Sequence, residues 1–89
     1  MCHVLVCDDE KDIVAALKIY LEAEGYDVLT AYNGREALEV CAQKQVDLIL
    51  LDIMMPGMDG IVTMSRLRET SNVPVILLCL LYTSDAADE

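Results

Sequence analysis

The sequence predicts one α/β domain built around a parallel sheet, and three observations support this prediction. The chain has 89 residues, which is enough for a single small domain. Short apolar runs alternate with segments of helical periodicity, beginning and ending with a strand. A hydrophobic fraction of 55% argues against disorder. Strands that alternate with helices form right-handed crossovers, which make the strands parallel and place helices on both faces of the sheet.

Residues 4–25 predict the first strand and the first helix. Residues 4–6 (VLV) form a continuous apolar run, which suits a strand buried on both faces. Apolar side chains then recur at helical spacing and predict one inward helix face, made of Ile13, Leu17, Tyr20 and Leu21. Gly25 closes this helix, because glycine readily adopts the left-handed conformation that follows many helices.

The middle of the chain predicts a second strand, a second helix and a third strand. Residues 28–32 have mixed polarity, which suits a strand at the edge of the sheet. Asn33 can cap the helix that follows it. The inward side of this helix is predicted to carry Ala37, Leu38 and Cys41. Residues 46–51 are almost wholly apolar and predict a buried third strand, which ends in Asp52.

A loop, a third helix and a fourth strand complete the predicted order. Pro56, Gly57 and Gly60 mark the loop. Apolar residues at every third position predict the helix: Ile61, Met64 and Leu67. Residues 73–81 form the fourth apolar run. Because the first and third runs are the most apolar of the early strands, they belong at the centre of the sheet. The predicted strand order is therefore 2-1-3-4, that of a flavodoxin-like, doubly wound fold.

Charge and hydropathy exclude several classes of partner. Six basic and sixteen acidic residues give a formal net charge of −10. Such a chain repels nucleic-acid phosphate, so we expect this segment to make no direct contact with DNA or RNA. No stretch has the length and polarity of a membrane span, and no basic start precedes an apolar run. We therefore expect no membrane contact, and the expected location is the cytoplasm.

The four cysteines, Cys2, Cys7, Cys41 and Cys79, include no CxxC pair. A metal site made of Cys2, His3 and Cys7 is one interpretation. Cys2 and His3 are adjacent, however, so on a strand they point to opposite faces, and the close paired spacing of zinc sites is absent. We favour the other interpretation, in which these cysteines act as small apolar residues flanking a buried strand.

Acidic residues follow the two strands that are expected at the centre of the sheet. Ligands of doubly wound sheets bind beyond the carboxyl ends of the strands, where the strand order reverses. Here that point lies between Asp8 and Asp9 on one strand and Asp52 on the other. Each acid alone could be a turn residue or a helix cap. Three carboxylates in one crevice instead predict a hard divalent cation, Mg²⁺ first and Mn²⁺ second, which relieves their repulsion.

These motifs resemble the receiver domain of bacterial two-component response regulators, most of all the winged-helix transcription-factor class. The resemblance runs from about residue 3 to residue 78. It rests on residues 4–10 (VLVCDDE), 48–60 (LILLDIMMPGMDG) and 73–78 (VPVILL), together with Tyr32-Asn33-Gly34 before the second helix.

The resemblance implies a phosphorelay function and a role for each site residue. Asp52 matches the aspartate that a sensor histidine kinase phosphorylates. Asp9 and Asp52 are implied to bind Mg²⁺ directly, Asp8 to help through water, and the backbone carbonyl of Met54 to complete the ligands. A receiver catalyses its own phosphotransfer and is a phosphoacceptor, not a conventional turnover enzyme.

Other functions remain as alternatives to the receiver. A Mg²⁺-dependent phosphatase with an Asp nucleophile would need a second Asp two residues later, where Met54 stands. A dinucleotide-binding enzyme is disfavoured because no GxGxxG follows the first strand. A third alternative is a fragment with no function of its own.

The resemblance ends at the fourth strand. The family has Thr or Ser at the position of Cys79, followed by a fifth strand with a Lys and two further helices. Residues 79–89 match none of these and instead resemble the translation of a transposase-end sequencing adapter. We therefore expect residues 1–78 to be the N-terminal part of a receiver domain and 79–89 to be a non-native tail. The fifth strand and last two helices would be missing, and the uncovered fourth strand would promote self-association.

Overall fold

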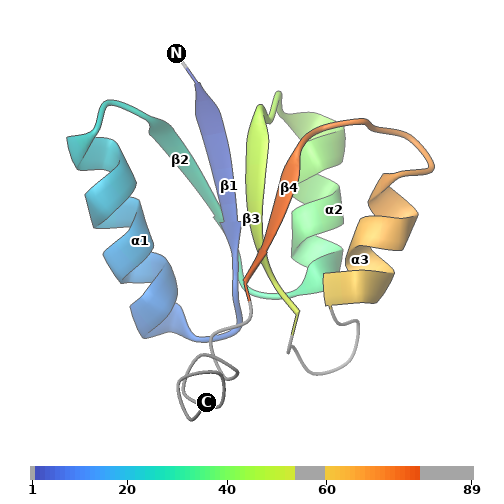
Figure 1. Cartoon of the computed structure of the whole chain (residues 1–89), viewed down its shortest axis with the longest axis horizontal. Coiled ribbons are helices and arrows are strands. Elements are labelled where there is room, and N and C mark those ends of the chain that lie inside the picture. The colour runs from blue at the N-terminus through green and yellow to red at the C-terminus, as the bar shows by residue number, and fades with distance from the viewer. Residues whose placement is uncertain (1, 54–59, 79–89) are drawn as a thin grey trace, which may run out of the picture.

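The computed structural model describes residues 2–53 and 60–78. They form a parallel sheet of four strands with three helices, which alternate along the chain (Figure 1). The bounds are β1 His3–Cys7, α1 Lys11–Ala23, β2 Asp27–Ala31, α2 Gly34–Gln43, β3 Leu48–Asp52, α3 Gly60–Leu67 and β4 Val75–Leu78. None of the helices in the described ranges has both the length and the apolar character that crossing a membrane requires.

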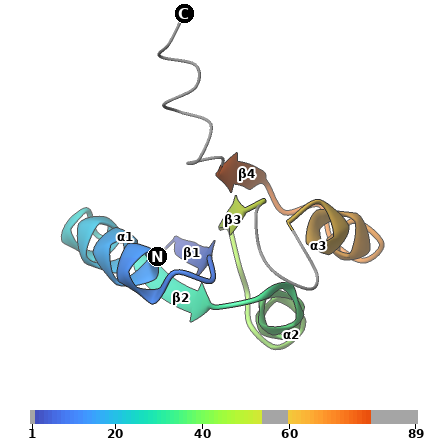
Figure 2. The same cartoon turned by 90° about the horizontal axis from the view of Figure 1, so that it is seen from below.

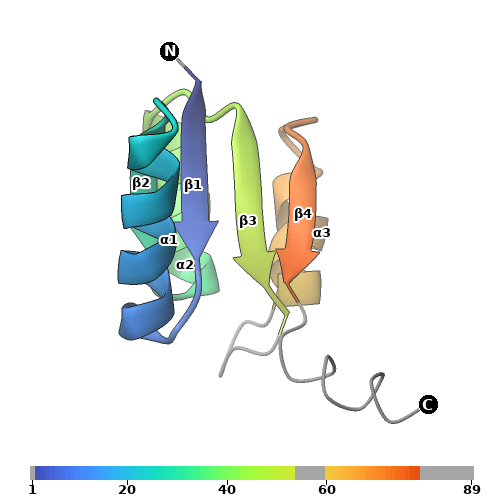
Figure 3. The ribbon, with the colours of Figure 1, turned by 60° about the vertical axis from the view of Figure 1, so that its left-hand side comes forward.

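The strand order is β2-β1-β3-β4, and each neighbouring pair is parallel. The arrows of β1, β3 and β4 point the same way in Figure 3. The predicted strand order and the flavodoxin-like topology are therefore confirmed. The carboxyl ends of β1 and β3 lie side by side, with Cys7 paired to Leu51.

Helices cover both faces of the sheet, with α1 on one face and α2 and α3 on the other (Figure 2). On the α1 face, Val4 and Val6 pack against Val14 of the helix. On the opposite face, Leu5 and Leu51 belong to the cluster covered by α2 and α3. Because β1 contributes to both clusters, it is buried on both faces, as its apolar sequence predicts.

The inward face of α1 differs from the prediction at Tyr20. This side chain is 74% exposed, whereas Val14 is buried and Leu17 and Leu21 pack beneath the helix. Tyr20 precedes Leu21 by one residue, or about 100° of helical rotation, which takes it out of the contact. The helix ends as predicted, since Gly25 has a φ of +95°. The Gly25 and Tyr26 amides donate to the Glu22 and Leu21 carbonyls and complete the C-terminal cap.

Asn33 caps α2, as predicted. Its side-chain oxygen accepts a hydrogen bond of 2.9 Å from the Glu36 amide. In return, Glu36 accepts a bond of 2.8 Å from the amide of Tyr32. These reciprocal bonds satisfy amides at a helix start and fix where β2 passes into α2. Ala37 is buried on the inward side of the helix.

Several boundaries differ modestly from the sequence-based ones. β2 ends one residue earlier, at Ala31, and β3 begins at Leu48, two residues later than predicted. β4 lies within the predicted run, of which residues 79–81 fall outside the described part. Ile61 of α3 is 48% exposed, and the buried residues of this helix are Gly60, Thr63 and Leu67.

Candidate functional site

Three carboxylates meet where β1 and β3 end. Asp8 and Asp9 follow β1, and Asp52 is the last residue of β3. Each can offer one oxygen atom such that the three atoms lie within 4.8 Å of one another. Asp8 is 1% exposed and Asp52 is 8% exposed, whereas Asp9 is open to solvent. The predicted parallel order thus brings together acids that are more than forty residues apart in sequence.

Asp8 is the most constrained of the three acids. Its Oδ1 accepts a hydrogen bond of 2.9 Å from the Glu10 amide. Its Oδ2 is buried and has no hydrogen-bond partner among the described residues. Burial raises the pKa of Asp8 to about 6, opposed by the Glu10 amide and assisted by the nearby charge of Asp52. A buried carboxylate oxygen without a donor is costly, and a bound cation would satisfy it.

Gly60 holds the start of α3 against the end of β3. Its amide donates a 3.1 Å hydrogen bond to the carbonyl of Ile53. A Cβ atom at this position would collide with the Asp52 carbonyl oxygen and lie 2.7 Å from the Ile53 Cα. Glycine is therefore required by close backbone approach. The sequence marked Gly60 only as a loop residue, so its role beside Asp52 was missed.

Cys7 lies directly before the acids and is buried. Its thiol donates to the Asn33 carbonyl oxygen at 3.4 Å. Burial, followed by the charges of Asp8 and Asp52, raises the pKa of this thiol to about 12. The thiol therefore stays neutral near pH 7 and behaves as a small apolar residue. In the described ranges the three acids form the only group of metal-ligating side chains, so a Cys2–His3–Cys7 site is absent from them.

Other predicted site residues fall outside the described part of the chain. These are Met54, expected to offer its backbone carbonyl, and Pro56 and Gly57, expected to shape the turn behind the site.

The arrangement defines a class of protein: a doubly wound domain with three carboxylates gathered where its two central strands end. All the available donors are carboxylate oxygens, which Mg²⁺ prefers over nitrogen or sulfur ligands. The unsatisfied Oδ2 of Asp8 fits the same interpretation. Mg²⁺ uses few protein carboxylates and keeps several waters, which leaves space for a phosphoryl group.

Comparison with known proteins identifies the family. The model of the response regulator receiver domain matches residues 4–88. The chain therefore belongs to the response regulator receiver domain family, and the resemblance to receiver domains is confirmed. Membership places the chain in two-component signal transduction.

One curated relative is the uncharacterized transcriptional regulatory protein YkoG of Bacillus subtilis (strain 168). It is 46% identical over 77 residues, which cover 85% of this chain and 34% of YkoG. The chain thus spans about a third of the length of this relative.

Two solved structures show the same fold. The response regulator TrrA of Thermotoga maritima, in complex with Mg(2+)-BeF, is 37% identical with a TM-score of 0.84, covering 99% of this chain and 79% of TrrA. A complex of the histidine kinase ThkA with TrrA matches with 41% identity and a TM-score of 0.84, covering 90% of this chain and 70% of that chain.

Proposed function

We propose that the chain accepts a phosphoryl group on Asp52 from a sensor histidine kinase, with Mg²⁺ held by Asp8, Asp9 and Asp52. The observation that carries this proposal is the buried Oδ2 of Asp8, which has no hydrogen-bond partner among the described residues. It belongs to a carboxylate in the three-acid group whose ligand atoms lie within 4.8 Å. The Mg(2+)-BeF complex of the related TrrA supports the choice of ion.

The chemistry follows from the donor set. A carboxylate oxygen of Asp52 attacks the phosphorus, and the bond from phosphorus to the donor's imidazole nitrogen breaks. The imidazole leaves with the bonding electron pair and takes a proton from solvent. The carboxylate nucleophile needs no general base, because it carries no proton to remove. A bound Mg²⁺ would offset the negative charge of the carboxylates and of the phosphoryl oxygens.

The remaining site residues support this step. Asp8 and Asp9 would hold the ion, Asp8 through water, and the backbone carbonyl of Met54 is proposed as a further ligand. Gly60 lets the start of α3 approach the backbone of Asp52. Each chain would take one phosphoryl group, so the domain acts as a phosphoacceptor and not as a turnover enzyme.

A kinase partner and a cytoplasmic location complete the proposal. The complex of ThkA with TrrA supports a histidine kinase as the phosphodonor. In the part of the chain that the structure describes, Cys2, Cys7 and Cys41 are free thiols, which fits a reducing compartment. The net charge of −10 argues against DNA contact by this segment. YkoG is named a transcriptional regulatory protein, so an output domain acting in transcription is proposed for the longer protein.

The test is to incubate the protein with acetyl phosphate and Mg²⁺ and to measure its intact mass. We expect the mass to increase by one phosphoryl group. EDTA should prevent this addition, and Asp52→Asn should not show it. The matched control is Asp12→Asn, an acid in the first turn of α1, which should still be phosphorylated. Continuous phosphate release with turnover would favour the phosphatase alternative. No addition to a folded protein would contradict the proposal and favour an inert fragment.

We further propose that residues 1–78 are the native receiver segment and that 79–89 are a non-native tail. The family match reaches residue 88, but the structure does not describe residues 79–89. The support is the likeness of the tail to a translated adapter. Codons that differ from the adapter across this stretch of the coding DNA would contradict the proposal.

A further inference from the structure

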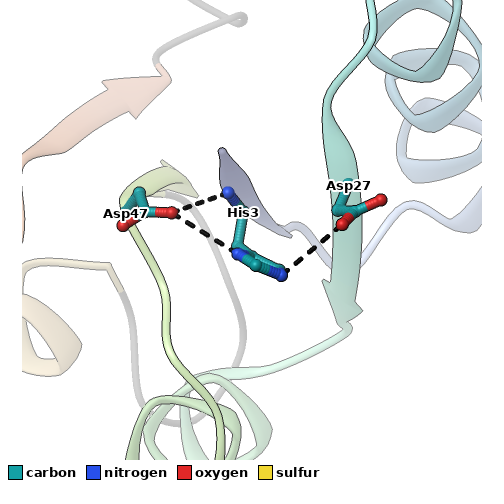
Figure 4. A network of polar contacts seen from close by, with 3 residues as sticks. All are labelled: His3, Asp27 and Asp47. Atoms are coloured by element: carbon teal, nitrogen blue, oxygen red, sulfur yellow. Dashed lines mark hydrogen bonds and ion pairs between the residues drawn. The ribbon is translucent and has the colours of Figure 1, made fainter. Parts of the chain in front are cut away.

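The only histidine of the chain, His3, lies at the end of the sheet where the strands start, opposite the end that carries the acidic site (Figure 4). His3 is the first residue of β1 and lies between two carboxylates. Asp27 begins β2, and Asp47 immediately precedes β3. The imidazole therefore bridges three consecutive strands of the sheet, at the end where all of them start.

The contacts on the two sides of the ring are similar. His3 Nε2 lies 3.5 Å from Asp27 Oδ2, and His3 Nδ1 lies 3.5 Å from Asp47 Oδ2. The backbone amide of His3 also donates to Asp47 Oδ2 at 2.8 Å. The Nδ1 atom is buried without a hydrogen-bond partner in the part of the chain that the structure describes. The ring is thus fixed in place, while one of its nitrogens lacks a good partner.

The protonation state of the ring decides how many of these contacts are favourable. A neutral imidazole has one N–H and one bare nitrogen, so one of the two carboxylates would face a lone pair. A protonated imidazole has two N–H groups and can donate to both. We propose that His3 is a proton-dependent clamp, which ties β2 and β3 to β1 through Asp27 and Asp47 when the imidazole is protonated.

Two other charged residues lie near the imidazole ring, and one of them already forms an ion pair. Glu22 of α1 and Lys44 at the end of α2 line the same groove of about 480 Å³. Glu22 is paired with Lys18 at 3.0 Å, and Lys44 is the lysine that lines this groove. Asp27 and Asp47 are therefore the carboxylates that contact the ring.

The sign of the pH dependence follows from these contacts. A protonated imidazole can donate to both Asp27 and Asp47, whereas a neutral one can donate to only one of them. The contacts of the ring should therefore stabilise the sheet more in acidic than in alkaline solution. The His3 amide, with help from the ring, lowers the pKa of Asp47, so this carboxylate stays ionised into more acidic solution.

The test is a double-mutant cycle at pH 5.5 and pH 8, using His3→Gln, Asp27→Asn and the double variant. At pH 5.5 we expect His3→Gln to lower the folding constant about two- to five-fold, the range typical of exposed ion pairs. Most of this loss should be a coupling between positions 3 and 27, and the coupling should be smaller at pH 8, where the neutral ring has a single N–H donor. Titration of the distant acidic site is common to all variants and cancels in the cycle. Asp12→Asn, outside this contact set, is the matched control and should show no coupling to position 3.

Backbone exchange gives a second measurement that leaves His3 in place. The Asp27 amide donates to the Cys2 carbonyl at 3.0 Å, and the Asp47 amide donates to the His3 carbonyl at 2.8 Å. After correction for intrinsic rates, protection of both amides should fall between pH 5.5 and pH 8. Asp47→Asn should remove this difference. A coupling that is the same at both pH values, or protection that does not change, would overturn the proposal.

Discussion

Replacing the buried acid Asp8 with asparagine should stabilise the fold in the absence of divalent cations. Burial raises the pKa of Asp8 from 3.8 to about 6, a shift of about two units. Each unit corresponds to about 1.4 kcal/mol, so ionised Asp8 costs the folded state about 3 kcal/mol near neutral pH. Because the folded-state pKa is raised, the contribution of Asp8 to stability is full below about pH 4. It is lost as the pH rises through about 6.

The assay is thermal unfolding in EDTA, followed by circular dichroism. At pH 7.5 we expect Asp8→Asn to unfold about 12–24 °C above the parent protein, from about 4–8 °C per kcal/mol in a domain of this size. At pH 4 the two proteins should unfold at similar temperatures, because Asp8 is then mostly protonated. The asparagine can keep the bond from the Glu10 amide, so the comparison isolates the charge.

Mg²⁺ should reverse the order of the unfolding temperatures of the parent protein and Asp8→Asn. The exposed acid Asp9 provides a control. Added Mg²⁺ should raise the unfolding temperature of the parent protein through binding to the folded state, and should have little effect on Asp8→Asn. Asp9→Asn removes an exposed charge and should change the metal-free stability far less than Asp8→Asn. If Asp8→Asn were no more stable than the parent at pH 7.5 in EDTA, the electrostatic reasoning would be refuted.

Three further variants or reactions test local contacts. Gly60→Ala places a Cβ against the backbone of Asp52 and Ile53 and should lose about 1–3 kcal/mol in urea unfolding; an unchanged midpoint would contradict the packing. Asn33→Ala removes the cap of α2 and should cost about 1 kcal/mol, whereas Asn33→Asp should retain most of the stability. Iodoacetamide at pH 8 should alkylate exposed Cys2 and spare buried Cys7, whose pKa is about 12; equal rates in peptide mapping would show that Cys7 is accessible.

The strand order could be predicted because the polarity of a strand's sequence indicates how deeply the strand is buried. A strand covered on both faces is apolar at every position, as residues 4–6 are, whereas an edge strand such as β2 has mixed polarity. Parallel order then brings the carboxyl ends of β1 and β3 together, so the gathering of Asp8, Asp9 and Asp52 follows without further information.

Features that depend on tertiary contacts could not be predicted. Tyr20 and Val14 both fit a helical pattern, and only the packing of α1 on the sheet shows that Val14 is the buried one. The sequence does not distinguish the burial of neighbouring Asp8 and Asp9, although this decides which carboxylate carries the raised pKa. The clamp at His3 depends on Asp27 and Asp47, which only the strand register brings to its two sides.

The most direct test of the central claim is to locate the phosphoryl group on the chain. The protein would be treated with acetyl phosphate and Mg²⁺, reduced with borohydride, digested and sequenced by mass spectrometry. Borohydride converts an aspartyl phosphate to homoserine and so marks the modified residue. We predict homoserine at position 52 and unmodified aspartate at positions 8 and 9. Homoserine at another position, or none in a protein that has gained a phosphoryl group, would contradict the assignment of Asp52 as the phosphoacceptor.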